Sequence, residues 1–505
     1  MAAFGIKRES ASGPGAGRYK HVFGKENPKN KTYFNLQLTS VATEGPLISC
    51  SSAHWAVPFA GGGGPVYVST HEAFGKVEPG CAVLNGAHKS AVQDLVFSPF
   101  NPSLLVTGSL DGTLALWDCS SSTPSMPTTI LSPHRNSVRS TLFHPSIPSL
   151  LASASLDQSV KLFDVGEGRS REVGAVNLES LGFEAIVNDM SYDYEGGLLA
   201  VACRDKSVRI CDPRAPQAVV TTLSSASSLG RSSRLAWGIA GNSNALLTAS
   251  SLSGGQRTLA LWDARYERTQ PVLQKVVDNS SGQLHLLLDD STGLCFLVGK
   301  GDTVVKCFES TFLEEVISAS SSTVSEELPV SVDKASEFQT SREPFAGVCM
   351  LPKSSCDVAA IEVARILKLT PDSVVPLSFF VPRSDQLREY FQDDLFPPVR
   401  NYSGGHDGAT VEDWVSGVRS FPPELTSLQP EGLVPLSQRP VDNNRRGSAK
   451  ADAYREQLQR EEEERRRREQ EFQRLEALAT QYAAANPNTS MGGGAGGEVA
   501  EEEWD

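Results

Sequence analysis

The chain has 505 residues, 39% of them hydrophobic, and a formal net charge of −14, which allows a large folded core or several domains. An acidic chain is a poor default nucleic-acid binder, and the lack of any run of about 18 apolar residues argues against a transmembrane helix. Nine scattered cysteines without CxxC pairs are typical of reduced cytosolic thiols rather than of a disulfide framework or a zinc site.

The first 31 residues run against this overall charge. They contain seven lysines and arginines and two glutamates, a net charge of +5 (7 − 2). A basic end can meet an acidic protein surface, so we predict a binding role for Lys20, Lys25, Lys29 and Lys31. Ordinary solvated lysines are the alternative. Residues 19–23 are the candidate for a strand that closes the fold described next.

A repeated phrase dominates the middle of the chain. It reads VTGSLDGTLALWD at residues 106–118 and ASASLDQSVKLFD at 152–164, and weaker copies end at 212, 263 and 309. The closing acids of the five copies are 46, 48, 51 and 46 residues apart. Self-similarity at this period with a Trp-Asp ending indicates WD-type propeller blades. One blade cannot bury both faces of its sheet, so blades stack in a ring, which usually serves as a binding platform.

The best repeat shows how a blade is built. Strands are predicted at residues 92–97, 104–107 and 114–117. Between the last two, Asp111-Gly112 is a tight-turn dipeptide. We also predict a buried hydrogen-bonded set of structural, not catalytic, residues. Its members are His88, Asp111, Trp117 and a hydroxyl from Thr107 or Ser109.

Later repeats depart from this pattern. His134 and Asp157 remain in the second copy, but Phe163 replaces the tryptophan, and Cys211 replaces the aromatic residue of the third. We therefore expect the hydrogen-bonded set to be lost there and packing alone to hold those blades.

Two further segments are candidates for blades. Residues 40–78, with the strand-like PVYVST at 65–70, are predicted to form a sixth blade, and residues 345–381 a seventh. A strand from one end of the chain is expected to join a blade from the other, which leaves no open sheet edge.

The character of the chain changes after residue 400. Residues 401–451 are rich in Pro, Gly, Ser and Asn and are predicted to be an extended linker. In that linker, Ser448 follows Arg445-Arg446-Gly447, which makes it a candidate phosphorylation site for a basophilic kinase. Residues 452–485 contain no Pro or Gly and predict a helix. Residues 486–505 are predicted to be a disordered acidic tail.

The predicted helix has alternating spacings of four and three residues, which is the seam of a coiled coil. The apolar seam residues are Tyr454, Leu458, Phe472, Leu475, Ala479 and Tyr482. The run EEEERRRR at 461–468 forms i,i+4 pairs worth roughly 0.2–0.5 kcal/mol each. Such pairs can also hold a solitary helix, so a charge-stabilised single helix is the alternative to the coiled coil that we favour.

No catalytic or cofactor-binding constellation is visible. The glycine run at 61–64 lacks the Gly-Lys-Ser/Thr ending of a phosphate loop. The eight histidines form no HxxxH pair or His/Cys cluster, and there is no GxSxG elbow. We predict a protein that is not an enzyme and has no cofactor or metal.

Several short motifs lie in a fixed order along the chain. They are RYKHVFG (18–24), MLPK (350–353), CDVAAIEVARILKL (356–369), VPR (381–383), FQDDLFPP (391–398) and EDW (412–414). The first resembles the opening signature of coronins, a family of actin-filament-binding WD-repeat proteins, and the others resemble their shared C-terminal extension. With the placement of the helix, the resemblance covers about residues 18–420.

The resemblance implies an all-β fold: a seven-bladed WD-repeat β-propeller over residues 1–400, with a C-terminal extension from about residue 345 packed along its underside. It implies binding to filamentous actin, self-association as a dimer or trimer, and influence on the actin-related-protein branching complex and on cofilin-driven disassembly. The expected location is the cytoplasm and cytoskeleton, at the cell cortex. The alternative is a WD-repeat scaffold for another complex, such as trafficking machinery, with weak or no filament binding.

Two positions depart from the family pattern. Gln37 stands where many animal coronins have an arginine important for filament binding. In the helix, Arg474, Leu475 and Leu478 match the family's trimer signature, but Ala479 occupies the place of its glutamate, so dimer and trimer both stay open.

The last five residues resemble the acidic motif of branched-actin nucleation-promoting factors. They are Glu501, Glu502, Glu503, Trp504 and Asp505. Carboxylates would steer this motif onto a basic groove of the branching complex, and the indole would supply a desolvated anchor. A solubilising tail with an incidental tryptophan is the alternative.

Overall fold

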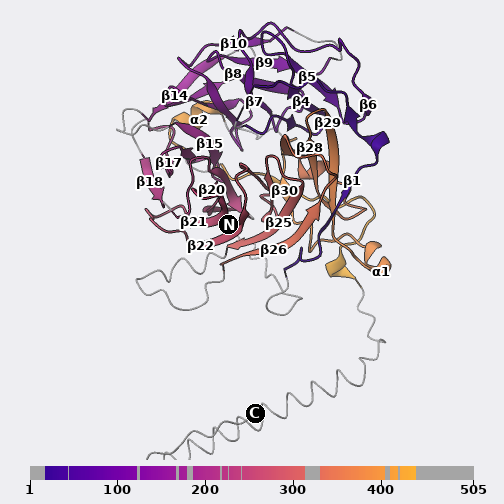
Figure 1. Ribbon diagram of the computed structural model, residues 1–505. Coiled ribbons are helices and arrows are strands. Elements are labelled where there is room, and N and C mark those ends of the chain that lie inside the picture. Colours follow the sequence, from indigo (N-terminus) through magenta and orange to yellow (C-terminus); the bar gives the residue numbers. More distant parts are fainter. Residues whose placement is uncertain are drawn as a thin grey trace, which may run out of the picture. The chain divides into compact units, whose positions relative to one another are not determined.

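Seven small β-sheets follow one another around a ring (Figure 1). The computed structural model describes residues 17–439 except for 42, 44, 122–125, 167–169, 179–185, 216–218, 226, 240, 313–329, 404–409 and 419–420. The ring confirms the predicted seven-bladed propeller, and each legible repeat supplies one blade.

We number the blades in chain order. Blade 1 contains β3 (Ser49–Cys50), β4 (His54–Pro58) and β5 (Val66–Thr70). Blade 2 contains β7 (Val92–Phe97), β8 (Leu104–Ser109), β9 (Leu114–Asp118) and β10 (Thr129–Leu131). Blade 3 contains β11 (Val138–Phe143), β12 (Leu150–Ser155), β13 (Ser159–Asp164) and β14 (Arg171–Asn177).

The remaining blades follow the same order. Blade 4 contains β15 (Val187–Tyr192), β16 (Leu199–Cys203), β17 (Ser207–Cys211) and β18 (Val219–Ser224). Blade 5 contains β19 (Arg234–Ile239), β20 (Asn242–Ser251), β21 (Gln256–Asp263) and β22 (Leu273–Asn279). Blade 6 contains β23 (Leu284–Leu288), β24 (Leu294–Gly299), β25 (Val304–Phe312) and β26 (Val330–Gln339). Blade 7 contains β27 (Gly347–Met350), β28 (Glu362–Leu369), β29 (Ser373–Phe380) and three short strands named next.

The N-terminal end of the described chain closes the ring at blade 7. β1 (Phe23–Glu26) and β2 (Tyr33–Phe34) both pair antiparallel with β29, one after the other along its length. β6 (Gly75–Lys76), which follows blade 1, pairs parallel with β2. Blade 7 therefore combines strands from both ends of the propeller, as we predicted for closure of the ring.

Strand pairing in this segment starts later than residues 19–23, where we predicted it. Residues 18–21 form a turn, and the N–H of Val22 donates to the carbonyl of Tyr19 at 3.0 Å. Tyr19 is only 1% exposed, and its hydroxyl donates to the carbonyl of Leu395 at 2.8 Å. This anchor on the C-terminal extension holds the chain in a turn, so the first paired residue is Phe23.

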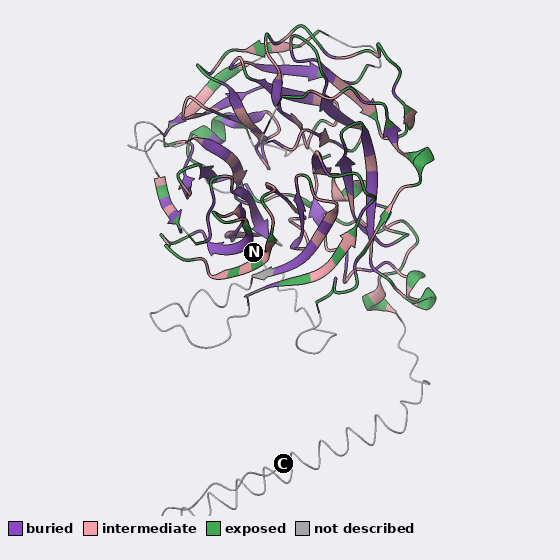
Figure 2. Cartoon of the chain, in the orientation of Figure 1, coloured by how far each residue is buried: buried purple, intermediate pink, exposed green. Residues whose placement is uncertain are grey.

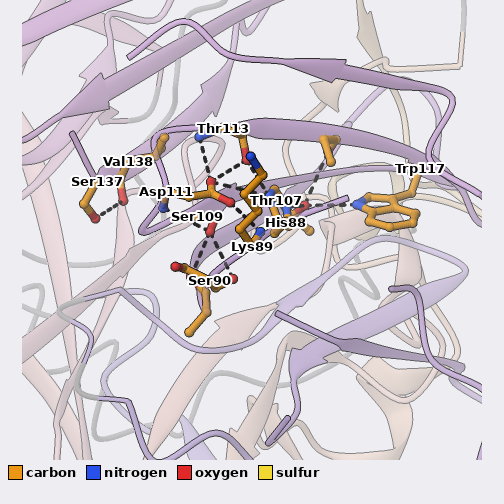
Figure 3. Close-up of polar contacts among 12 residues, drawn as sticks. His88, Lys89, Ser90, Thr107, Ser109, Asp111, Thr113, Trp117, Ser137 and Val138 are labelled. Carbon is orange, nitrogen blue, oxygen red and sulfur yellow. Dashed lines mark hydrogen bonds and ion pairs between the residues drawn. The ribbon is translucent and has the colours of Figure 1, made fainter. Parts of the chain in front are cut away.

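The predicted hydrogen-bonded set of blade 2 forms a continuous relay (Figure 3). The indole N–H of Trp117 donates to Thr107 Oγ1 at 3.0 Å, and Thr107 Oγ1 lies 2.7 Å from His88 Nε2. On the other side of the ring, His88 Nδ1 lies 2.7 Å from Thr113 Oγ1, whose hydroxyl donates to Asp111. Every donor finds one acceptor when His88 carries its proton on Nδ1.

Thr107 is thus the hydroxyl of the relay, and Ser109 is not. The Ser109 hydroxyl faces the carbonyl oxygens of Ser90 and Ala91, at 3.1 and 3.2 Å. Burial lowers the pKa of His88 despite the nearby Asp111, so the imidazole is held in its neutral form.

The expectation that packing alone holds the later blades is wrong. In blade 3, His134 Nε2 still lies 2.7 Å from Ser153 Oγ although Phe163 offers no N–H. In blade 4, the buried Arg209 donates to Asp205 at 2.5 Å, and this pair takes the place of the relay. The substitutions therefore change the polar contacts of these blades without removing them.

Apolar side chains fill the spaces between neighbouring blades, so most strand interiors are buried (Figure 2). Trp117 and Trp262 are 1% and 0% exposed, and Trp237 is 6% exposed. All three tryptophans are therefore core residues. The first strands of the blades surround a central cavity of about 760 Å³.

The C-terminal extension continues as part of the propeller unit up to Arg439. It contains η4 (Lys353–Ser355), α1 (Asp385–Arg388), β30 (Val399–Arg400), α2 (Val411–Val415), β31 (Leu425–Thr426) and η5 (Leu436–Gln438). Trp414 on α2 is 1% exposed, and its indole N–H donates to the Gly196 carbonyl of blade 4 at 3.1 Å. Composition predicted a linker from residue 401. That boundary is too early, because Trp414 and Phe421 anchor the stretch to the blades.

The remaining C-terminal predictions lie outside the described residues. They are the linker site Ser448, the helix over 452–485 and the tail over 486–505. In the described part of the chain, no helix has the length and apolar character needed to cross a bilayer.

Candidate binding site on the segment that closes the ring

Residues 17–37, which we call the closing segment, begin in a turn held by Glu309 of blade 6 and continue along the outer edge of blade 7 from Phe23. Lys25 of β1 pairs with Ser378, and Phe34 of β2 pairs with Ser373. The two partners are five residues apart on β29, which corresponds to about 17 Å of strand. η1 (Lys29–Lys31) bridges β1 and β2, so Lys25, Lys29 and Lys31 follow one another along this edge.

The closing segment concentrates positive charge at the surface. Lys20, Lys25, Lys29 and Lys31 are all exposed, and their side chains have no hydrogen-bond or ion-pair partner among the described residues. The segment contains one acidic residue, Glu26, which faces the buried Lys368 and accepts a hydrogen bond from the N–H of Ser341 at 2.8 Å. Because Glu26 is engaged with the core, it does not pair with the exposed lysines.

The structure adds three residues that the charge pattern did not reveal. Phe23 and Phe34 are 49% and 43% exposed, although both lie on strands. Lys76 of β6 is brought next to Phe34 by the parallel pairing of β6 with β2. A sequence separation of about forty residues hid this contact, but the alternation of buried Tyr33 with Phe34 would have marked Phe34 as outward-facing.

Gln37 lies just beyond the lysines. Its backbone carbonyl accepts a hydrogen bond from the N–H of Ala60 at 2.7 Å, and its side chain is exposed. It borders a hollow of about 280 Å³, which the glycines at 61 and 62 also line. The position is thus accessible, and a neutral amide stands there in place of a cation.

The described residues contain no group of three or more His, Cys, Asp or Glu side chains placed to hold a metal ion. His88 and Asp111, the most conspicuous acid–base pair, lie inside the relay of blade 2 and not in a cleft that opens to substrate. We therefore take the closing segment as the candidate binding site among the described residues.

Comparison with known proteins places this architecture in a family. A model described as a domain of unknown function (DUF1899) matches residues 15–76, which include the closing segment. A WD domain, G-beta repeat model matches residues 81–118, 125–164 and 178–212, and a type of WD40 repeat matches 374–422. Coronin-A of Dictyostelium discoideum is 35% identical over 408 residues, which span 80% of this chain and 84% of that protein. The chain belongs to the coronin family.

Other relatives agree with this assignment. Human Coronin-2A is 28% identical over 454 residues, which span 85% of this chain and 78% of that protein. The solved WD40 domain of Toxoplasma gondii coronin matches with a TM-score of 0.69 at 24% identity, over 81% of this chain and 98% of that one. The resemblance inferred from the sequence is confirmed, and a coronin with this propeller is a binding protein rather than an enzyme.

Proposed function

We propose that this coronin binds the side of actin filaments through its closing segment. The observation that carries the proposal is the row of exposed, unpaired lysines along blade 7, whose single acid is turned inward to Lys368. Exposed cations on a rigid sheet edge fit an acidic polymer surface, and they would steer the encounter at long range.

The closing segment also offers apolar contact area. Phe23 begins β1 and Phe34 ends β2, and aromatic residues are enriched among the anchors that dominate binding energy. The lysines would then set the rate and salt dependence of association, while the phenylalanines would add salt-independent affinity.

Co-sedimentation of the full chain with polymerised actin at several salt concentrations tests this proposal. We expect binding at low salt that weakens as ionic strength screens the lysines. Protein that stays in the supernatant even in dilute buffer would contradict it. That result would favour the alternative, a WD-repeat scaffold for another complex, which the neutral Gln37 supports.

We further propose that the helix predicted over 452–485 gathers two or three chains, so that several propellers act together on a repetitive filament. Sedimentation of the full chain against a chain ending at residue 451 tests this part. The same molecular mass for both would rule out self-association through the helix.

The acidic tail would connect the filament-bound protein to the actin-related-protein branching complex. In this proposal the protein modulates branch nucleation and, together with cofilin, filament turnover in the cortical cytoskeleton. A peptide of residues 485–505 should recover the branching complex from solution, and Trp504→Ala should reduce that recovery. Equal recovery by the two peptides would end the proposal for the tail.

A further inference from the structure

Two free cysteines meet where the ring closes. Cys50 lies on β3, the first strand of blade 1, and Cys349 lies on β27, the first strand of blade 7. These two strands are neighbours across the seam between the blades. Both side chains pack against the same hydrophobic cluster, which contains Trp55 and Leu367. The two cysteines therefore lie at the same seam, on strands of different blades.

The pair is also reachable by small molecules. Cys50 and Cys349 both line the central cavity of about 760 Å³, and both are partly exposed. Burial and the contact with Cys50 raise the pKa of the Cys349 thiol well above its ordinary value, so Cys349 keeps its proton. We therefore assign the first reaction with an oxidant to Cys50, whose sulfur acts as the nucleophile.

We propose that Cys50 and Cys349 are a reversible disulfide site that locks blade 1 to blade 7. The oxidant is a hydroperoxide such as hydrogen peroxide. In the first step the Cys50 sulfur takes one peroxide oxygen to give a sulfenic acid, and the other oxygen leaves as water. In the second step the Cys349 thiol displaces that hydroxyl, the S–S bond forms, and a second water leaves.

The reaction is balanced. Two thiols and one hydrogen peroxide give one disulfide and two waters; the two sulfurs lose two electrons and the peroxide oxygens gain them. Two equivalents of a small thiol such as glutathione reverse it.

A second cysteine pair, in blade 6, does not span a seam between blades. Cys295 and Cys307 lie on adjacent strands, but both belong to blade 6 and are buried at 0% and 1% exposure. A bond between them would join strands that already form one sheet. By contrast, Cys349 follows Cys50 by 299 residues (349 − 50), and a bond across the seam would close almost the whole propeller covalently.

Peptide mapping of the full-length protein tests the proposal. The folded protein is treated with hydrogen peroxide, its remaining thiols are blocked, and it is digested with trypsin without reduction. Residues 32–76 and 343–353 are tryptic peptides that contain Cys50 and Cys349, respectively, as their only cysteines. We expect these two peptides to be joined, and dithiothreitol to separate them.

Thermal unfolding supplies a second readout. Oxidation should raise the midpoint of the wild-type protein by about 3–6 °C, and it should leave Cys50→Ser and Cys349→Ser unchanged. Cys119→Ser, which alters the cysteine that directly follows β9 in blade 2, should behave like the wild type.

Oxidation of Met126, which is 75% exposed, reports that the peroxide has acted. If Met126 is converted to the sulfoxide while both seam cysteines are recovered as blocked thiols, the proposal is overturned. A rise in the unfolding midpoint that persists in both serine variants would overturn the claim that this bond locks the ring.

Discussion

The ammonium group of Lys368 on β28 lies 3.8 Å from the carboxylate of Glu26 on β1, and β29 separates the two strands. Lys368 is 0% exposed, and it also donates to Thr340 Oγ1 at 2.8 Å. Burial lowers the pKa of Lys368, and the charge of Glu26 opposes that shift. The buried charge of Lys368 in blade 7 is thus compensated by Glu26 from the start of the propeller. This contact holds the closing segment on blade 7.

Glu26→Gln should lower the free energy of unfolding by about 1–2 kcal/mol. The glutamine still accepts the hydrogen bond from Ser341, but the buried Lys368 loses its counter-charge. Chemical denaturation of the full chain measures the effect. Glu267→Gln, at an exposed position, is the matched control and should change stability by less than about 0.5 kcal/mol. Equal effects of the two substitutions would show that Glu26 has no special role.

Thr107→Val should destabilise more than Thr248→Val. The Thr107 hydroxyl forms hydrogen bonds with both Trp117 and His88. Thr248, by contrast, accepts one hydrogen bond, from Trp262 at 2.9 Å. Valine has nearly the same shape but leaves these buried groups unpaired, so we expect a loss of about 2–4 kcal/mol in blade 2 and about 1–2 kcal/mol in blade 5. Denaturation midpoints at constant m-value compare the two variants. The reverse order would contradict the relay.

Asp94→Asn should stabilise the protein above pH 6. Burial raises the pKa of Asp94 to about 6, although Thr141 donates two hydrogen bonds to this carboxylate. A raised carboxyl pKa means that the native state binds the proton more tightly than the unfolded chain. The contribution of Asp94 is therefore most favourable at low pH and is lost as the pH rises from about 4 to about 6. Unfolding free energies should show the variant gaining about 2 kcal/mol over that interval.

The contribution of Asp118 to stability should have the opposite pH dependence to that of Asp94. A hydrogen bond from the backbone N–H of Ser120 lowers the pKa of Asp118, so its contribution is present above pH 4 and lost as the pH falls. The Asp118→Asn variant should thus have a lower free energy of unfolding than the wild type at neutral pH, and the two should be equally stable in acid. If both variants follow the same pH trend, the environments assigned to the two carboxyls are wrong.

Trp414→Ala should release the end of the extension while the blades stay folded. The indole ring packs against His144 at 5.8 Å between centroids, and Arg214 lies over it at 5.6 Å. Removing a buried tryptophan costs about 3–5 kcal/mol, so hydrogen exchange should rise at residues 410–418 and 421–439. Trp414→Phe keeps most of the packing and loses the bond to Gly196, so it should cost about 1 kcal/mol. Unchanged exchange in the alanine variant would contradict this anchoring role.

The sequence predicts most of the ring because each blade is encoded locally, by short apolar strands bounded by turn residues. The strand predicted at 92–97 is β7 with the same bounds, and the strand-like 65–70 contains β5. The choice of Thr107 over Ser109 was open, because both hydroxyls lie on one strand and only the register across the blade separates them.

Contacts between distant segments were harder to predict. The turn at Tyr19 depends on Leu395, and the packed extension depends on Trp414 reaching blade 4. Neither partner is near in sequence, so composition suggested a strand in the first case and a linker in the second. The lysines of the closing segment were visible as charge, but Phe34 and Lys76 became neighbours only through a parallel pairing of two-residue strands.

Affinity for polymerised actin, measured by co-sedimentation for two charge-reversal variants, tests the filament contact most directly. Lys25→Glu/Lys29→Glu alters the closing segment, and Arg204→Glu/Arg231→Glu makes the same change in net charge at exposed positions of blade 4 and the loop before blade 5. If the closing segment is the contact, the first variant should lose at least about tenfold in affinity and much of its salt dependence. The second should bind like the wild type. Equal affinities for the two variants would contradict the assignment.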